Sequence, residues 1–209
     1  MRPRLMTLAV LGSALLAAVL PAQEERGVVV AGHVRNGGSP LSGAVVYLLP
    51  VDDTLRPEPD PPVIIDQRHL SFIPDVAVVT PGTEVRFMNS DEVLHNVFSP
   101  GLRSREPFDL GTYARTDLRA HRFMRPGVHV ILCHIHPEMV AFVLVVRTPH
   151  KVVTGADGSW RLEGVPPGRY VLHGWHARHW RDELTDTIRV GPAGVDDLLV
   201  TLGRDGGVR

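Results

Sequence analysis

Short apolar runs recur along the chain, and polar turns rich in glycine, proline, asparagine and aspartate separate them. The runs are rich in valine, isoleucine and aromatic residues, and each is about as long as a β-strand. After residue 22 no stretch keeps a helical period, so the chain is expected to be all-β, and its short strands and tight turns favour two small β-sandwiches. The expected strands cover residues 27–34, 43–50, 62–66, 76–80, 84–90, 127–133, 140–147, 160–165, 169–175, 186–190 and 198–202.

Two polar, proline-containing stretches indicate where domains meet. DDTLRPEPDPP, at residues 52–62, and RTPHK, at residues 147–151, are typical of linkers or long loops. They enclose a block at 60–148 that holds the only cysteine of the chain. This block is expected to form one domain, and the segments on either side of it to form another.

The first 22 residues are expected to be a secretory signal peptide. MRPR supplies positive charge, LMTLAVLGSALLAAVL is an apolar run too short for a typical span, and cleavage is expected after Ala22. The mature chain is therefore expected to be periplasmic or secreted, with no membrane span. Loss of Arg2 and Arg4 lowers Lys+Arg from 22 to 20 against 23 Asp+Glu, a net charge of about −3. No basic block remains, which argues against a nucleic-acid partner.

The single cysteine, Cys133, lies in the stretch VILCHIHPEM at residues 130–139. Cysteines of secreted proteins usually pair, but Cys133 has no second cysteine in the chain to pair with. It can therefore be an intermolecular disulfide partner, a buried free thiol or a metal ligand. His136 and Met139 follow it as C-x-x-H-x-x-M on a tight loop, and this spacing favours the metal ligand.

A further candidate ligand lies upstream, where NSDEVLHNVFS places His95 in a polar turn after a strand. One thiolate, two imidazoles and a thioether are the ligand set of a blue-copper site, with methionine as a long axial ligand. Zinc would favour more thiolates or a carboxylate, and no thioether. Each residue alone has an ordinary structural explanation, such as a core methionine or a loop histidine, but the joint pattern favours copper.

The stretches VTPGTEVRFMNSDEVLHNVF and RPGVHVILCHIHPEMVAFVLV resemble a cupredoxin, most closely the amicyanin and plastocyanin-like group. Amicyanin-type proteins carry Cys-x-x-His-Pro-x-Met, matched here by CHIHPEM, and a ligand histidine followed by Asn-Val, matched by HNV at 95–97. The resemblance covers residues 63–147 and implies a Greek-key β-sandwich in which Asn96 ties the two ligand loops together. It also implies one copper ion, cycling between Cu(I) and Cu(II), held by His95, Cys133, His136 and Met139.

Three residues of the ligand loop depart from the family pattern: His134, Ile135 and Glu138. They leave the ligands intact and bear on the reduction potential and the docking surface. His134 competes with His136 for the metal, but it is expected to point away from Cys133, its neighbour in the chain, and to lie at the surface.

The remaining histidines carry weaker signals. His129 alternates with Val128 and Val130 on a strand and is expected to face solvent or the neighbouring domain. HGWHARHW spaces three histidines evenly, but a strand would not point all three the same way, so a second metal site is disfavoured. If HARHW is instead a loop, its histidines would approach the copper face. These three are His173, His176 and His179, and His69 and His121 show no spacing signal.

The flanking segments resemble a second module. GVVVAGHVRNGGSPLSGAVVYLLP, at 27–50, and VTGADGSWRLEGVPPGRYVLHGWH, at 153–176, are similar to early and late strands of a carboxypeptidase-regulatory-like or transthyretin-like β-sandwich. The cupredoxin-like block would then be inserted into a loop of this sandwich, which would be discontinuous and comprise residues 27–55 and 150–205. Insertion is tolerated where domain termini lie close together at the surface.

The resemblance implies an electron carrier rather than an enzyme, with no catalytic residues. A c-type cytochrome or a periplasmic dehydrogenase is the expected partner. A copper carrier or store, and a structural or carbohydrate-binding β-sandwich protein, remain as alternatives. A multicopper oxidase or nitrite reductase is disfavoured, because the chain has one ligand cysteine and no second cupredoxin-like block.

Overall fold

The structure is a computed structural model and describes residues 27–52, 55–102, 106–203 and 206–209. The expected signal peptide, residues 1–22, lies outside these ranges. Within them the chain is built from β-strands and one short 3-10 helix, η1 (Ala177–His179), so the expected all-β class is confirmed. None of the helical segments in the described ranges has the length and apolar character needed to span a membrane.

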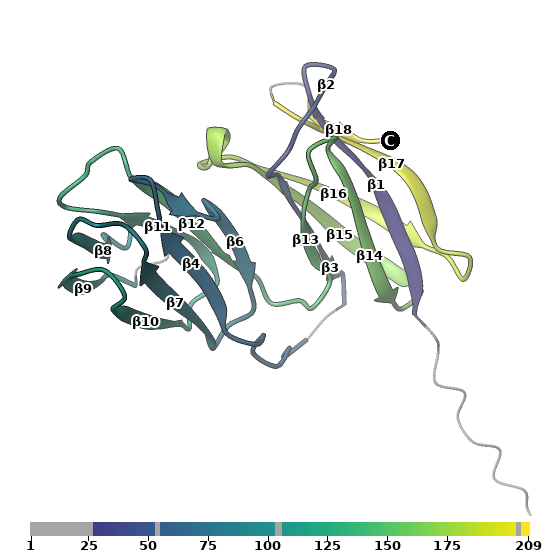
Figure 1. Ribbon diagram of the computed structural model, residues 1–209. Helices are drawn as coiled ribbons and strands as arrows, with labels where there is room; N and C mark the ends of the chain where they lie inside the picture. The colour runs from purple at the N-terminus through teal and green to yellow at the C-terminus, as the bar shows by residue number, and fades with distance from the viewer. Residues whose placement is uncertain (1–26, 53–54, 103–105, 204–205) are drawn as a thin grey trace, which may run out of the picture.

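The central segment folds into a sandwich of two sheets (Figure 1). Neighbouring strands are often distant in sequence, as in a Greek key, and each sheet contains one parallel pair: β4 with β7, and β6 with β12. One sheet has the order β10 (Leu118–Phe123), β7 (Thr83–Asn89), β4 (Val63–Gln67), β5 (Phe72–Ile73). The other has the order β6 (Val76–Val79), β12 (Val140–Val145), β11 (Gly127–Leu132), β8 (His95–Ser99), β9 (Phe108–Tyr113).

Strands from the two ends of the chain pair with one another in a second sandwich. In Figure 1 the purple β1 runs beside the green β14 and the yellow β17. One sheet contains β14 (Ser159–Val165), β1 (Val28–Asn36), β17 (Val195–Leu202) and β18 (Gly207–Val208), with β2 (Ser39–Pro40) beside β1. The other contains β13 (Lys151–Val153), β3 (Val45–Pro50), β15 (Gly168–Trp175) and β16 (Glu183–Val190).

Each sandwich has its own apolar core, because alternate side chains of its strands point inward. The central core includes Phe87, Phe123 and Ile131, and the flanking core includes Leu48, Trp160 and Leu172. A third buried cluster joins the two sandwiches. In it, Trp175 of β15 meets Phe142 of β12 edge-on, with 5.4 Å between ring centroids. Phe142 and Leu144, on the outer face of β12, are therefore buried against the flanking sandwich.

The structure also contains strands that the sequence pattern did not predict. β8, β9 and β10 follow one another in the polar stretch between residues 95 and 123. β10, LRAHRF, has only one fully buried residue, Phe123, so its apolar signal is weak. Because arginine and histidine occupy half of its positions, this strand lacks the run of valine and isoleucine by which the other strands are recognised.

Candidate metal centre

Cys133 directly follows β11 and begins the loop that leads to β12. Along β11 the side chains alternate, so Cys133 shares the inward face with Ile131 and is only 3% exposed. Its thiol is not in a disulfide within the chain. The Cys133 sulfur is therefore buried at one end of the central sandwich.

His95 follows β7 as expected, but it is the first residue of β8 and fully buried, so the expectation that it lies in the polar turn is wrong. β8 pairs with β11 through Phe98 and Leu132. This pairing brings the start of β8 beside the end of β11, and the backbone N–H of Asn96 donates to Cys133 Sγ at 3.4 Å. A cysteine binds a metal ion as the thiolate, and this N–H group is placed to donate to the sulfur.

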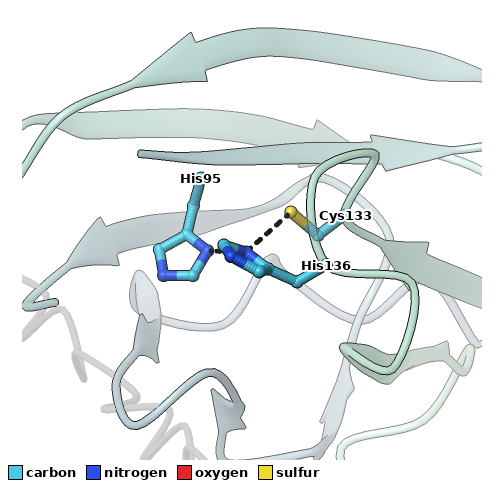
Figure 2. A group of neighbouring side chains, drawn as sticks. All are labelled: His95, Cys133 and His136. Carbon is cyan, nitrogen blue, oxygen red and sulfur yellow. Dashed lines mark hydrogen bonds between the residues drawn. The ribbon is translucent and has the colours of Figure 1, made fainter. Parts of the chain in front are cut away.

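His136 completes a group of three side chains that converge on one point (Figure 2). Its Nδ1 lies 3.1 Å from His95 Nδ1 and 4.0 Å from Cys133 Sγ. All three ligand atoms lie within 4.8 Å of one another. An ion at about 2.0 Å from nitrogen and 2.3 Å from sulfur would separate trigonal ligands by about 3.5–3.8 Å. The three side chains therefore fit a transition-metal ion with small adjustments.

Met139 ends the same loop and is 1% exposed, in the same buried cluster as Cys133. Its backbone N–H donates to the His136 carbonyl at 3.0 Å, which closes the turn that carries both side chains. Met139 also lines a cavity of about 400 Å³ together with residues 71–75, Glu138 and Val140. Its role as a thioether ligand stays a prediction.

The other ring nitrogen of His95 is held by a carboxylate. His95 Nε2 lies 2.9 Å from Asp91 Oδ2. An ionised carboxylate only accepts hydrogen bonds, so Nε2 carries the proton and donates it, and a neutral ring leaves Nδ1 free with its lone pair toward His136. Carboxylate–histidine–metal arrangements of this kind fix the tautomer and orientation of a ligand histidine.

Asp91 also supports a neighbouring turn. Its Oδ1 accepts the backbone N–H of His69 at 2.7 Å, and its Oδ2 accepts that of Leu70 at 3.0 Å. His69 and Leu70 have φ of 56° and 54°, a left-handed conformation that costs a non-glycine residue about 1–3 kcal/mol. Burial alone would raise the pKa of Asp91, but the hydrogen bonds from Leu70, His95 and His69 outweigh it and lower this pKa. The carboxylate therefore remains ionised at neutral pH.

A second carboxylate, Asp109, is linked to the site through Asn96. Asn96 accepts from the His134 backbone N–H at 3.4 Å, and its side-chain N–H donates to Asp109 at 2.7 Å. The Gly111 backbone N–H bound to Asp109 lowers the pKa of that carboxyl, against a smaller contribution from burial, and Asn96 and His134 lower it further. His134 is exposed and stacks on Phe98 with 3.6 Å between ring centroids. Sequence reasoning missed Asp91 and Asp109, and only the position of Asp91 four residues before His95 hinted at its contact.

His129 is fully buried, so the expectation that it faces solvent or the neighbouring domain is wrong. It lies on the inner face of β11, and its ring packs edge-on against Phe123 at 4.9 Å. Val128 and Val130, on the opposite face, pack into the cluster between the sandwiches. Both faces of β11 are thus buried, and alternation alone could not tell which one faced outward.

The three evenly spaced histidines do not form a metal-binding group in the described part of the chain. His173 stacks on Tyr47, with ring centroids 4.4 Å apart. His176 donates from Nε2 to the Ser42 carbonyl and accepts the Arg178 N–H at Nδ1, so both its ring nitrogens are engaged. His179 is exposed on η1.

No protein-family model matches the sequence, and no curated protein matches it either. Among solved structures, the chain is similar to a copper-containing nitrite reductase from Thermus scotoductus SA-01, with 24% identity and a TM-score of 0.40 over 56% of this chain and 28% of that one. It is similar to amicyanin from Paracoccus versutus, with 18% identity and a TM-score of 0.38 over 48% of this chain and 98% of that one.

A third similar structure is a purple cupredoxin from Nitrosopumilus maritimus, with 26% identity and a TM-score of 0.36 over 42% of this chain and 100% of that one. The structural neighbours are thus cupredoxins, at low identity. The matched region spans little more than a quarter of the nitrite reductase.

Proposed function

We propose that this protein is a copper protein that holds one ion and carries single electrons between redox partners. One observation carries the proposal: the Nδ1 atoms of His95 and His136 and the buried Sγ of Cys133 converge at the end of the central sandwich. A thiolate with two imidazoles suits copper, and Met139 would complete the ligand set as a weak axial thioether. When bound, copper would supply a reversible one-electron couple.

The chain's own residues would hold the ligands still and keep water away. His95, Cys133 and Met139 are buried, and the Asn96 N–H is directed at the sulfur. Little rearrangement would then accompany the change of oxidation state, which is what fast electron exchange requires. His136 is the one member of the group that is only half-buried, so its ring edge is the proposed point of exchange.

The surface beside the site suits a protein partner. Leu94, next to His95 in the chain, is 53% exposed, and Ile135, next to His136, is 43% exposed. Exposed apolar side chains that gather at one place mark interaction surfaces. The proposed partner is a redox protein such as a c-type cytochrome or a periplasmic dehydrogenase, and the proposed location is the periplasm or the extracellular space.

The test is to load the purified protein with Cu(II), record its visible spectrum and measure its voltammetry. We expect an intense thiolate-to-copper absorption and a reversible one-electron wave, and Cys133→Ser should lose the absorption because a hydroxyl is a poor, harder ligand. An unchanged spectrum in Cys133→Ser would refute the assignment. Copper uptake without a reversible couple would favour a copper carrier or store, and no uptake would favour a structural or carbohydrate-binding protein.

A further inference from the structure

Three N–H groups from two separate parts of the chain meet on the Asp91 carboxylate. One comes from the ring of His95, and two come from the backbone of the turn between β4 and β5, at His69 and Leu70. Asp91 itself is held in place, because its backbone N–H donates to Asn89 Oδ1 at 2.9 Å. The carboxylate is thus a fixed bridge between the metal centre and an exposed turn.

We propose that Asp91 is a positioning residue that selects Nδ1 of His95 as the metal-binding nitrogen and couples occupancy of the site to the turn at His69 and Leu70. The coupling of site occupancy to the turn rests on the proposed copper function. The choice of the ring nitrogen concerns the protein without metal and does not depend on that function.

The Asp91 carboxylate determines which ring nitrogen of His95 carries the proton, because of what each group can donate or accept. A carboxylate accepts and does not donate, so it stabilises the tautomer with the proton on Nε2. An asparagine at this position would have one acceptor oxygen and an NH₂ group that only donates. It could not receive all three N–H groups, and the ring would lose its preference for one tautomer.

Coupling to the turn follows from the left-handed backbone at His69 and Leu70. The turn closes with reciprocal backbone bonds between Arg68 and Ser71, and the Asp91 oxygens accept the two N–H groups at its tip. Nε2–H would become a stronger donor with a metal bound at Nδ1, because the ring would lose electron density. Its charge-assisted bond to Asp91 would then tighten and hold the carboxylate more firmly under the turn.

The test compares the full-length protein with Asp91→Asn, Asp91→Glu and Glu92→Gln. Glu92 is the matched control, because it lies on the same loop, its side chain is 82% exposed, and its ion-pair partner is Arg115. Nitrogen NMR of the metal-free protein reports the His95 tautomer. We expect the Nε2–H form in the parent and in Glu92→Gln, a mixture in Asp91→Asn, and recovery in Asp91→Glu, which restores the carboxylate.

The coupling is tested by loading with Cu(I), which is diamagnetic, and by titrating Cu(II) against a competing chelator. Backbone N–H exchange at His69 and Leu70 should slow on loading in the parent but not in Asp91→Asn. Cu(II) affinity should fall about 10- to 100-fold in Asp91→Asn and stay unchanged in Glu92→Gln. A parent His95 protonated on Nδ1, or an Asp91→Asn variant with unchanged tautomer and affinity, would overturn the proposal. A parent that takes up no copper would refute the copper function and the coupling, while the tautomer measurement still decides the selection.

Discussion

The backbone N–H of Asn96 points at the sulfur of Cys133, although Asn96 lies on β8 and Cys133 follows β11, 37 positions away in sequence. The side chain of the same asparagine accepts the N–H of His134, the residue that follows the cysteine. Asn96 thus binds the ligand loop through its main chain and its side chain. Asn96 is 2% exposed, and its bond to the sulfur is buried while its bond to the His134 N–H is partly buried.

Asn96→Ala should loosen the ligand loop. The variant keeps the main-chain bond to sulfur but leaves the His134 N–H and the Asp109 carboxylate without this partner. Loss of these two partly buried hydrogen bonds should cost about 1–3 kcal/mol in the free energy of unfolding, measured in urea. Copper should also pass to a chelator faster than from the parent. Asn36→Ala, on β1 of the flanking sandwich, is the control and should release copper at the parental rate.

The metal-free protein should lose stability as the pH falls below about 6.5. Burial lowers the pKa of His129 from 6.5, against smaller opposing effects of the Arg125 carbonyl and Glu106. Burial likewise lowers the pKa values of His121, His150 and His176. The unfolded chain then binds more protons than the folded one, so stability is full above the unfolded pKa and falls as the pH drops toward the folded values. Urea unfolding between pH 5 and 8, a range of about three units around the His pKa, measures this slope.

His129→Gln measures how much His129 alone contributes to the loss of stability at low pH. Glutamine can still donate to the Arg125 carbonyl, which His129 Nε2 contacts at 2.8 Å, but it does not titrate. The slope of stability against pH below 6.5 should therefore become shallower, by at most about 1.4 kcal/mol per pH unit for one proton. Parallel slopes in the two proteins would show that His129 does not contribute.

Trp175→Ala should separate the two sandwiches. Trp175 is 1% exposed, contacts Phe142 across the interface, and donates its indole N–H to the Trp180 carbonyl. Removing so large a buried ring should cost about 3–5 kcal/mol. Hydrogen exchange of the β12 backbone should accelerate in this variant. Trp160→Ala creates a cavity inside the core of the flanking sandwich and does not alter the interface. Hydrogen exchange of the β12 backbone should therefore stay near its parental rate in this variant.

A shortened chain that ends at Thr148 should keep the central sandwich and lose the flanking one. β3 would lose both of its neighbours, β13 and β15, and β1 would lose β14 and β17. Residues 28–50 should then be cleaved quickly by protease, while the remainder still takes up copper. A protease-resistant 28–50 segment would show that the two flanks do not depend on each other, and would argue against the proposed insertion of one module into another.

The chain's pattern predicted the long, valine-rich strands well, because their side chains fill the cores of the sandwiches. It failed where burial arises from contacts that are distant in sequence. His95 looked like a turn residue because polar residues precede it, yet pairing with β11 buries it completely. His129 looked exposed because its neighbours are apolar, yet the second sandwich covers those neighbours.

The ligand spacing Cys133, His136, Met139 is local and could be read directly from the sequence. The contact between His136 and His95 could be expected only from a family resemblance, because it depends on how β8 meets β11. For Asp91 the sequence offers only its position four residues before His95, since the three N–H groups that it accepts are brought together by folding.

The pairing of strands from both chain ends has a consequence for the order of synthesis. β3 ends at Pro50, and its first partner, β13, begins only at Lys151. At about 5–20 residues per second, a ribosome needs about 5–20 s to make the residues between them. During that interval the central segment is completed, while β1 and β3 still lack the strands that pair with their backbone N–H and C=O groups. Chaperones that shield unpaired strands should therefore matter most for β1 and β3, far in sequence from the proposed copper ligands.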